Sequence, residues 1–263
     1  MGGTTKTEPL LVDLHCHILP GVDDGATHEA ESLRMLRVAE EEGIGLIAAT
    51  PHAHHCPAGR IPPKVARLNE LAVEQGLVVR VVPGQEVRLV ADMVARYRAG
   101  ELATLNGGHY LLLELPLSGP LPSYLRRAID DLQGIGLRPI LAHAERYGDI
   151  QRDPAPLREL IACGVPIQVN AGSITGPAER AARPAAERLL RERLVHLIAS
   201  DSHDDRWQPP RLRAALARAA EIAGAEYVDW MVASAAAVLR DEVIALPAPP
   251  PSGGSAWRGR PEA

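Results

Sequence analysis

Short apolar runs alternate with amphipathic patterns along most of the chain. A run such as VHLIAS is almost continuously apolar, which is typical of a strand buried on both faces. Between the runs, apolar side chains recur with helical spacing. In residues 29–43, Leu33, Leu36 and Ala39 form one stripe and Gly43 ends the pattern. The apolar runs predict seven strands, at residues 9–15, 44–52, 77–86, 110–116, 138–146, 165–172 and 195–203.

Helical patterns follow these strands in turn. They lie at residues 29–43, 63–76, 91–102, 124–136, 155–164 and 177–193, with two more at 211–224 and 226–239. Pro184 should interrupt or kink its helix, because proline removes a backbone donor and clashes with the preceding turn. Alternating strands and helices favour a parallel sheet, and seven units favour a closed α/β barrel. An open doubly wound sheet remains compatible with the pattern.

The chain shows no internal repeat and no sign of a second domain, and 263 residues suit one α/β barrel. We predict a single domain over 9–246, preceded by an N-terminal extension, 1–8. The tail, 247–263, is rich in proline and glycine and is expected to be disordered.

Polar side chains of the kinds that bind metals gather where the predicted strands end. In α/β barrels, active sites lie at the carboxyl ends of the strands. His, Asp or Glu ends six of the seven predicted strands, which is more than chance placement would give. The strand-end residues are Asp13, His15 and His17; His52; Glu86; Glu114; His143, Glu145 and Arg146; Gln168 and Asn170; Asp201 and His203.

The spacing of these residues indicates a metal site. Residues two apart on a strand point to the same side, so His15 and His17 should face one way, with Cys16 facing the core. Mixed imidazole and carboxylate ligands suit zinc, manganese or iron. Asp23 and Asp24 lie on the following loop, which we expect to curl back over the cluster.

Composition narrows the class of protein. A net charge of −5 argues against a nucleic-acid-binding surface. Three cysteines form no even disulfide framework and favour a reducing, cytoplasmic setting. No apolar run is long enough to span a bilayer, so we expect no direct membrane insertion.

The cysteines also exclude thiol-based phosphatase chemistry, which needs an arginine six residues after the nucleophile. The residues at that spacing are Val22, Pro62 and Val169. We expect His54, His55 and Cys56 to lie in a solvated loop or a substrate-facing lid. We interpret His28, His109 and His196, which do not end strands, as structural.

The motifs DLHCH…DDGA, ATPH, GQEV, LLLELP, LAHAERY and ASDSH…PP resemble those of a known family. This family comprises the bacterial metal-dependent protein-tyrosine phosphatases of the polymerase-and-histidinol-phosphatase (PHP) superfamily. Its members regulate capsular polysaccharide and exopolysaccharide synthesis and dephosphorylate bacterial tyrosine kinases. The resemblance runs from about Leu11 to about Leu239.

The resemblance implies a PHP-type distorted (β/α)7 barrel that holds three metal ions, usually manganese. It implies that His15 and His17 bind one ion with Asp201, that Glu86 bridges to a second ion with Glu114 and His143, and that Asp24, His52 and His203 hold the third. It implies that Arg146 binds the phosphate of a phosphotyrosine protein. The leaving tyrosyl oxygen needs little acid help, and Glu145 or a metal-bound water could supply its proton, a choice that the sequence leaves open.

One position departs from the family pattern. The family has a second phosphate-binding arginine just before a Pro-Pro pair, and here Gln208 stands there. Either Arg206 or Arg211 replaces it, with Arg206 favoured as a second catalytic, substrate-binding arginine, or the second arginine is missing and Gln208 itself binds the substrate through one neutral hydrogen bond. Two alternatives stay open, a PHP phosphoesterase acting on a small monoester such as histidinol phosphate, and a metal-bound regulatory protein with little turnover. The sequence leaves the oligomeric state undetermined.

Overall fold

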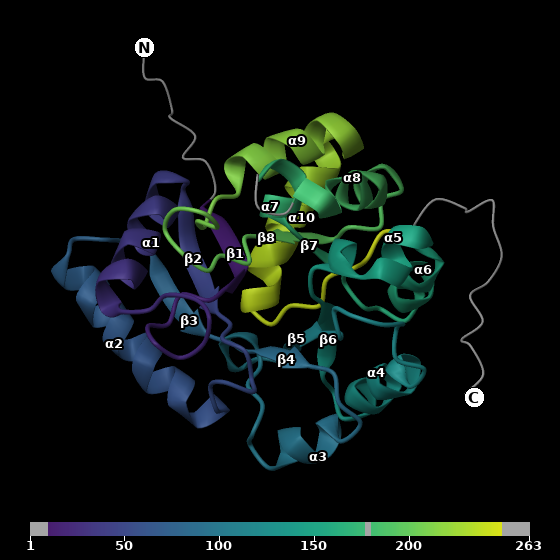
Figure 1. Cartoon of the computed structure of the whole chain (residues 1–263), viewed down its shortest axis with the longest axis horizontal. Helices are drawn as coiled ribbons and strands as arrows, with labels where there is room; N and C mark the ends of the chain where they lie inside the picture. The colour runs from purple at the N-terminus through teal and green to yellow at the C-terminus, as the bar shows by residue number, and fades with distance from the viewer. Residues whose placement is uncertain (1–9, 177–179, 249–263) are drawn as a thin grey trace.

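The strand ends of the sheets carry the candidate site. The structure is a computed structural model that describes residues 10–176 and 180–248. Its strands are all paired in parallel, as predicted, and form three small sheets (Figure 1). They are β1 (Leu11–Cys16), β2 (Ile44–Ala49) and β3 (Arg80–Pro83); β4 (Glu86–Arg88), β5 (Tyr110–Glu114) and β6 (Arg138–Leu141); and β7 (Gln168–Asn170) with β8 (Leu197–Ala199).

The predicted strand over 77–86 is wrong as a single strand. It divides at Gly84 and Gln85 into the end of β3 and the start of β4. The Gln85 side chain is buried, donates to the Cys56 carbonyl at 2.8 Å and accepts from Ala103 N at 2.9 Å. These bonds satisfy polar groups that a strand ladder would otherwise pair, so the break costs little.

Single β-bridges link the three sheets. Cys16 pairs with Ser202, His52 with Glu86, and Leu141 with Ile167. The described residues therefore form an α/β fold of three parallel sheets joined by isolated bridges, and they do not form one continuous closed sheet.

Helices surround these sheets (Figure 1). In α4, for example, Leu125, Ala128, Ile129 and Leu132 form one buried face, and each buried leucine contributes roughly 1.5–3 kcal/mol. The helices are α1 (Glu29–Glu41), α2 (Ile61–Glu74), α3 (Met93–Arg98), α4 (Leu125–Gly134), α5 (Gly148–Arg152), α6 (Ala155–Ala162), α7 (Ala171–Thr175), α8 (Arg183–Arg191), α9 (Arg213–Ala223) and α10 (Ala225–Leu239).

Two local expectations about helices need adjustment. Pro184 lies in the first turn of α8, so it begins a helix and does not kink one. The short helices α5 and α7 were not predicted, because five residues are too few to show a period. Among the described residues, no helix has the length and apolar character needed to cross a membrane.

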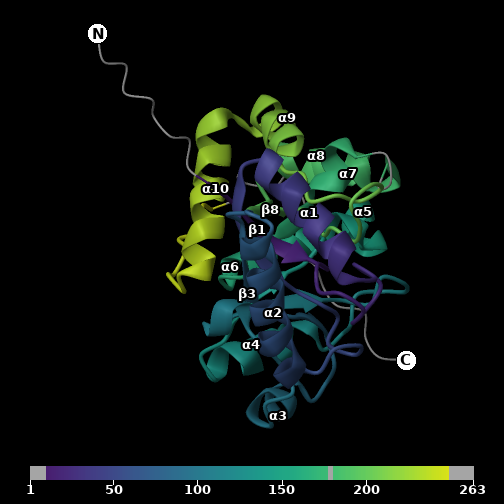
Figure 2. The same ribbon diagram turned by 90° about the vertical axis from the view of Figure 1, so that its left-hand side faces the viewer.

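An apolar cluster fills the space among the strands at one end of the molecule. Strand residues including Leu14, Leu112 and Ile140 meet Ala235 and Val238 of α10 there. Figure 2 shows α10 lying alongside β1 and β8, which it contacts. The polar residues at the carboxyl ends of the strands are not part of this apolar cluster.

The expected terminal segments fall almost wholly outside the described residues. This holds for the N-terminal extension, 1–8, and for all of the tail, 247–263, except its first two residues.

Candidate metal centre and active site

The end of β1 brings His15 and His17 together as predicted. Their Nε2 atoms are 3.2 Å apart, and both rings are fully buried. They lie 3.1 and 3.3 Å from the same oxygen of Asp201, and each is 3.5 Å from a carboxylate oxygen of Glu86. The register of β1 shifts between Asp13 and Cys16, an irregularity often found where strands aim side chains at a site.

Glu86 also faces a second set of side chains. His143 Nε2 lies 2.8 Å from Glu86 Oε1, and His52 Nδ1 lies 2.7 Å from Glu86 Oε2. Ligand atoms of His52, Glu86 and Glu114 all lie within 4.8 Å of one another. One buried carboxylate is therefore shared between two groups of ligand-type side chains.

The loop after β1 completes a third group. His17, Asp24, His52 and His203 offer ligand atoms within 4.8 Å of one another. Asp24 Oδ1 is 3.4 Å from His52 Nε2 and 3.6 Å from His203 Nε2. Asp24 is 60 % exposed, so this group lies nearest to solvent. All nine residues that the sequence predicted as metal ligands thus converge on one region.

Three of the histidines are held in one tautomer, with Nε2 aimed at the cluster. Their Nδ1 atoms face oxygens, namely Gln168 Oε1 for His15 (3.3 Å), Asp23 Oδ2 for His17 (2.8 Å) and the Asp201 carbonyl for His203 (2.8 Å). An oxygen of this kind accepts a hydrogen bond, so each Nδ1 carries a proton, and each Nε2 can offer its lone pair to a cation once it is deprotonated. This is the usual arrangement of metal-binding histidines.

The buried polar atoms of the second group also fit a cation. His52 Nδ1 and Glu86 Oε2 are 2.7 Å apart, yet neither makes a hydrogen bond with any described residue. Buried polar atoms without a partner are costly in a folded protein. A divalent ion held beside Glu86 would relieve this cost at its carboxylate oxygen, so the donor set fits a metal centre.

Gln168 and Asn170 connect the first and second groups. Gln168 Oε1 accepts from His143 N at 2.9 Å as well as facing His15, and its Nε2 donates to Asn170 Oδ1 at 2.8 Å. Asn170 Nδ2 in turn donates to Asp201 Oδ2 at 2.7 Å. The sequence placed both amides at a strand end, and Asp23 on the loop after β1, but gave these residues no role.

The backbone is strained at two candidate ligands. His143 has φ of 32° and Asp201 has φ of 51°, in the left-handed region that non-glycine residues seldom adopt. Such strain often marks functional sites. The adjacent loop is equally constrained, because a Cβ at Gly25 would lie 2.0 Å from the His17 carbonyl oxygen. The glycine of the DDGA motif therefore allows the loop to close onto His17.

Opposite charges compensate within the metal-free cluster. Burial lowers the pKa of His15, but Asp201 and Glu86 outweigh it and raise that pKa to about 10. At His203, burial lowers the pKa, but Asp24 and Asp201 outweigh burial and raise the pKa to about 9. Burial raises the pKa of Glu86, but His15 and other histidines hold it well below its usual value. A bound metal would displace these imidazole protons.

The arginines lie at the edge of the cluster. Arg146 is 34 % exposed, and its Nη1 is 3.2 Å from Asp201 Oδ2. Arg206 is 79 % exposed, with Asp205 as its recorded ionic neighbour at 4.0 Å. Gln208 anchors its loop through its carbonyl oxygen, which accepts from His203 N at 3.1 Å. The structure thus brings Arg146 to the cluster and records no such contact for Arg206.

The HAHHCPAG segment fits its prediction only in part. His54 and His55 are exposed in a turn after β2. Cys56 is buried, so its predicted solvent exposure is wrong. Its side chain packs into the main core, and its carbonyl is held by Gln85, a residue distant in sequence.

Several other predicted polar residues make structural contacts. Cys16 is a buried core residue, as predicted. Asp13 accepts from Ser200, and Glu145 accepts from Asn170 N and Ser173 Oγ. His28 caps α1 by accepting from Glu31 N, His109 pairs with Asp241, and His196 accepts from Ile167 N.

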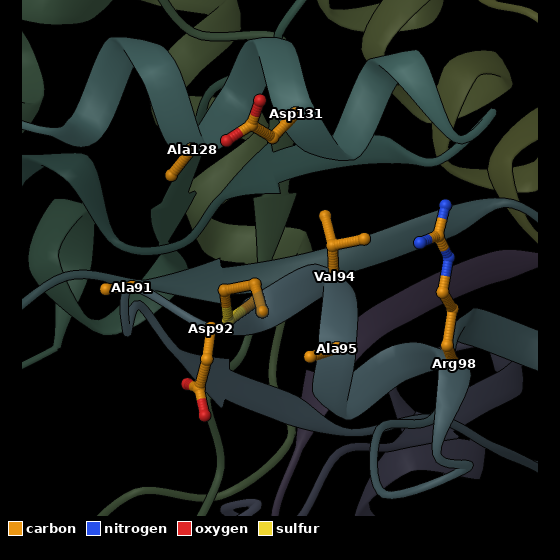
Figure 3. A pocket seen from close by; sticks show the side chains of 8 residues that line it. Ala91, Asp92, Val94, Ala95, Arg98, Ala128 and Asp131 are labelled. Carbon is orange, nitrogen blue, oxygen red and sulfur yellow. The ribbon is translucent and has the colours of Figure 1, made fainter.

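A separate cavity of about 300 Å³ lies between α3 and α4 (Figure 3). Its lining residues are Ala91, Asp92, Met93, Val94, Ala95, Arg98, Ala128 and Asp131. None of the nine candidate ligands lines it. We therefore assign the chemistry to the strand-end cluster, where the ligand-type side chains converge.

Buried histidines and carboxylates at the strand ends of an α/β fold define a metal-dependent hydrolase-like site. A family model described as capsular polysaccharide synthesis, CpsB/CapC, matches residues 11–240. The chain belongs to this family.

Its relatives carry phosphatase names. The chain is 32 % identical over 246 residues to the tyrosine-protein phosphatase YwqE of Bacillus subtilis, covering 92 % of this chain and 96 % of that one. It is 34 % identical over 207 residues to the putative tyrosine-protein phosphatase CapC of Staphylococcus aureus, covering 77 % and 81 %.

Solved structures agree with the sequence relatives. This chain matches a solved structure with a TM-score of 0.88 and 31 % identity. That structure belongs to a set of YwqE from Bacillus subtilis and CpsB from Streptococcus pneumoniae, described as unique metal-dependent tyrosine phosphatases. The match covers 93 % of this chain and all of that one. A histidinol phosphate phosphatase of Lactococcus lactis matches with a TM-score of 0.52 at 15 % identity, over 81 % and 92 %, which shows a shared fold alone.

Proposed function

We propose that this protein is a metal-dependent protein-tyrosine phosphatase. The observation that carries the proposal is the convergence of nine histidine and carboxylate side chains, with Arg146 at their edge. The names of its relatives support phosphotyrosine as the substrate. The family description supports a role in capsular polysaccharide synthesis. We extend the proposed role to exopolysaccharide synthesis, with a bacterial tyrosine kinase as the phosphoprotein substrate.

We infer that the nine residues hold three divalent ions, with manganese as the expected metal. The proposed sets are His15, His17 and Asp201; Glu86, Glu114 and His143, with Glu86 shared; and Asp24, His52 and His203. Bound divalent ions lower the pKa of a coordinated water and offset negative charge on phosphoryl oxygens. The Nδ1 contacts of His15, His17 and His203, which leave Nε2 as the metal-binding atom of each ring, support this proposal.

Arg146 is the proposed phosphate-binding residue of the chain. Its guanidinium reaches from Asp201 toward solvent, so it can meet a phosphoryl group that enters the cluster. The planar fork of donors matches two phosphoryl oxygens and orients the group for in-line attack. Arg206 remains a proposed second contact, supported by its place between His203 and the Pro-Pro pair.

The bridges between sheets support the expected distorted barrel. Strand pairing joins β1 to β2 and β2 to β3, and the His52–Glu86 bridge continues the register of β2 and β3 into β4. Strand pairing and the two remaining bridges then lead through β5, β6, β7 and β8 back to β1, with β3 and β4 sharing one place in the order. We infer that this ring is the PHP-type barrel. A cytoplasmic location is part of the proposal, because a kinase that uses ATP is its expected partner.

The experiment compares substrates on the manganese-loaded protein. Steady-state kcat/KM is measured for a phosphotyrosine peptide, p-nitrophenyl phosphate and histidinol phosphate. We expect clear preference for the phosphotyrosine peptide. A preference for histidinol phosphate would favour a small-molecule phosphoesterase, and no turnover of any ester would favour a regulatory protein, a possibility that Gln208 motivates.

A further inference from the structure

Arg88 is a cationic residue beside the cluster, and the proposed metal and phosphate sites do not include it. It ends β4, two residues after Glu86, so the two side chains leave the strand on the same side. Val87 between them packs into the main core. Across the sheet, Arg88 is in register with Glu114 of β5, and its Nε lies 4.0 Å from Glu114 Oε2.

The position of Arg88 is one from which it can meet a substrate. Its side chain is 50 % exposed, whereas that of Glu114 is only 7 % exposed. Its charge acts both on Glu114 and on His54 in the exposed turn. The guanidinium therefore lies at the border between the buried carboxylates and solvent.

A distance of 4.0 Å is too long for a hydrogen bond. The Arg88 guanidinium is attracted to the carboxylate of Glu114, but among the described residues none accepts a hydrogen bond from it. Its N–H groups can therefore donate to another acceptor. Glu114 in turn faces Glu86 and His52 as part of a candidate metal group. A metal ion there would offset the Glu114 charge and leave the Arg88 donors available for an anion.

Arg146 and Arg88 have matching positions around the cluster. Arg146 approaches the carboxylate of Asp201 and Arg88 approaches that of Glu114, and both side chains are partly exposed. A transferring phosphoryl group spreads its charge over three equatorial oxygens, which more than one cation can contact. Gln208 leaves a neutral side chain where a second arginine is expected, so a further cation has a place to act.

We propose that Arg88 is a phosphate-binding residue, whose guanidinium contacts the phosphoryl oxygens of the substrate from the Glu114 side of the cluster. The inference rests on the proposed phosphatase function. The alternative is that Arg88 only neutralises Glu114. That alternative predicts an effect on metal content and none on phosphate binding.

The test uses the manganese-loaded protein with Arg88→Gln and Arg88→Lys. The control is Arg126→Gln, because Arg126 is similarly exposed and pairs with Asp130 on α4, outside the cluster. The Kd of inorganic phosphate is measured by calorimetry, metal content by elemental analysis, and kcat/KM with both p-nitrophenyl phosphate and a phosphotyrosine peptide.

We expect Arg88→Gln to raise the phosphate Kd about tenfold or more, as loss of a charge-assisted contact should. Metal content should stay the same, kcat/KM should fall on both substrates, and Arg88→Lys should recover part of the loss. The control should match the unaltered protein.

An unchanged phosphate Kd, loss of metal, or no measurable phosphate binding by the unaltered protein would overturn the inference. A loss confined to the peptide would also overturn it, because the contact would then be with flanking residues. Weaker phosphate binding in Arg88→Gln, with no peptide turnover by the unaltered protein, would sustain the Arg88 site and reject only the proposed function.

Discussion

At the scale of single residues, Gln168 is the side chain that serves two candidate ligands at once. Its Oε1 faces His15 Nδ1 and accepts from the strained backbone of His143. Loss of a hydrogen bond to a ligating histidine typically weakens metal binding roughly 10- to 100-fold. We therefore predict that Gln168→Met weakens manganese binding, measured by calorimetry on metal-stripped protein.

A matched control for this prediction is Gln133→Met. The Gln133 side chain donates to the carbonyl of Cys163, outside the cluster, and should leave the manganese Kd unchanged. Equal manganese affinities for Gln168→Met and the unaltered protein would show that Gln168 does not orient His15.

Arg146 is predicted to act on substrate and not on metal. Arg146→Ala should lower kcat/KM roughly 10- to 100-fold, the worth of a charge-assisted contact of about 1.5–3 kcal/mol. Metal content, measured by elemental analysis, should be retained because Arg146 offers no lone pair to a cation. Kinetics close to those of the unaltered protein would assign Arg146 to surface charge alone.

Apolar runs revealed the strand ends where most of the candidate ligands lie, and the family resemblance implied the ligand set itself, including Asp24 on the loop after β1. The orienting residues could not be recognised in the same way. Gln168, Asn170 and Asp23 act through hydrogen bonds to side chains that only the folded chain brings near. Burial of Cys56 likewise depends on the distant Gln85.

At the scale of elements, the loop after His203 is shaped by its own backbone. Asp204 Oδ1 accepts from the backbone nitrogens of Arg206 and Gln208, at 2.6 and 3.3 Å. We predict that Arg206→Ala lowers kcat/KM for a phosphotyrosine peptide by more than Arg211→Ala does, because Arg211 lies beyond the Pro-Pro pair.

The same assay includes Gln208→Arg, which restores the arginine of the family pattern. A silent Arg206→Ala together with a strong gain from Gln208→Arg would mean that this loop supplies no second arginine. The Arg206 assignment would then be wrong, and Arg88 would be the remaining candidate for a second phosphate-binding arginine.

The order of strands and helices was predictable because burial on both faces leaves a continuous apolar run. The break between β3 and β4 was not, because the apolar run at the start of residues 77–86 predicted one strand through to Glu86. What divides it is the buried amide of Gln85, which bonds to backbone groups at Cys56 and Ala103. Such long-range pairing has no local pattern.

At the scale of the whole molecule, the buried cluster links metal binding to pH. In the metal-free protein His15 and His203 have pKa values of about 10 and about 9, above the ordinary 6.5. Their stabilising contribution is fully present below pH 6.5 and is lost as pH rises through the folded-state values. We predict that the Tm of metal-stripped protein falls from pH 6.5 to 8.5.

Over the same range, manganese should stabilise the protein increasingly, because ligands must be deprotonated to bind it. Differential scanning fluorimetry with and without manganese measures both trends. A Tm of the stripped protein that rises with pH over this window would contradict the charge pairing described for the cluster.

The central claim, that the cluster is a catalytic metal centre for phosphotyrosine hydrolysis, is tested most directly by removing and restoring the metal. Turnover of a phosphotyrosine peptide is followed after long incubation with excess chelator, then after dialysis and addition of Mn²⁺, with bound metal quantified at each stage. The account predicts that activity disappears with the metal and returns with manganese. Full activity in protein shown to be free of metal would contradict it.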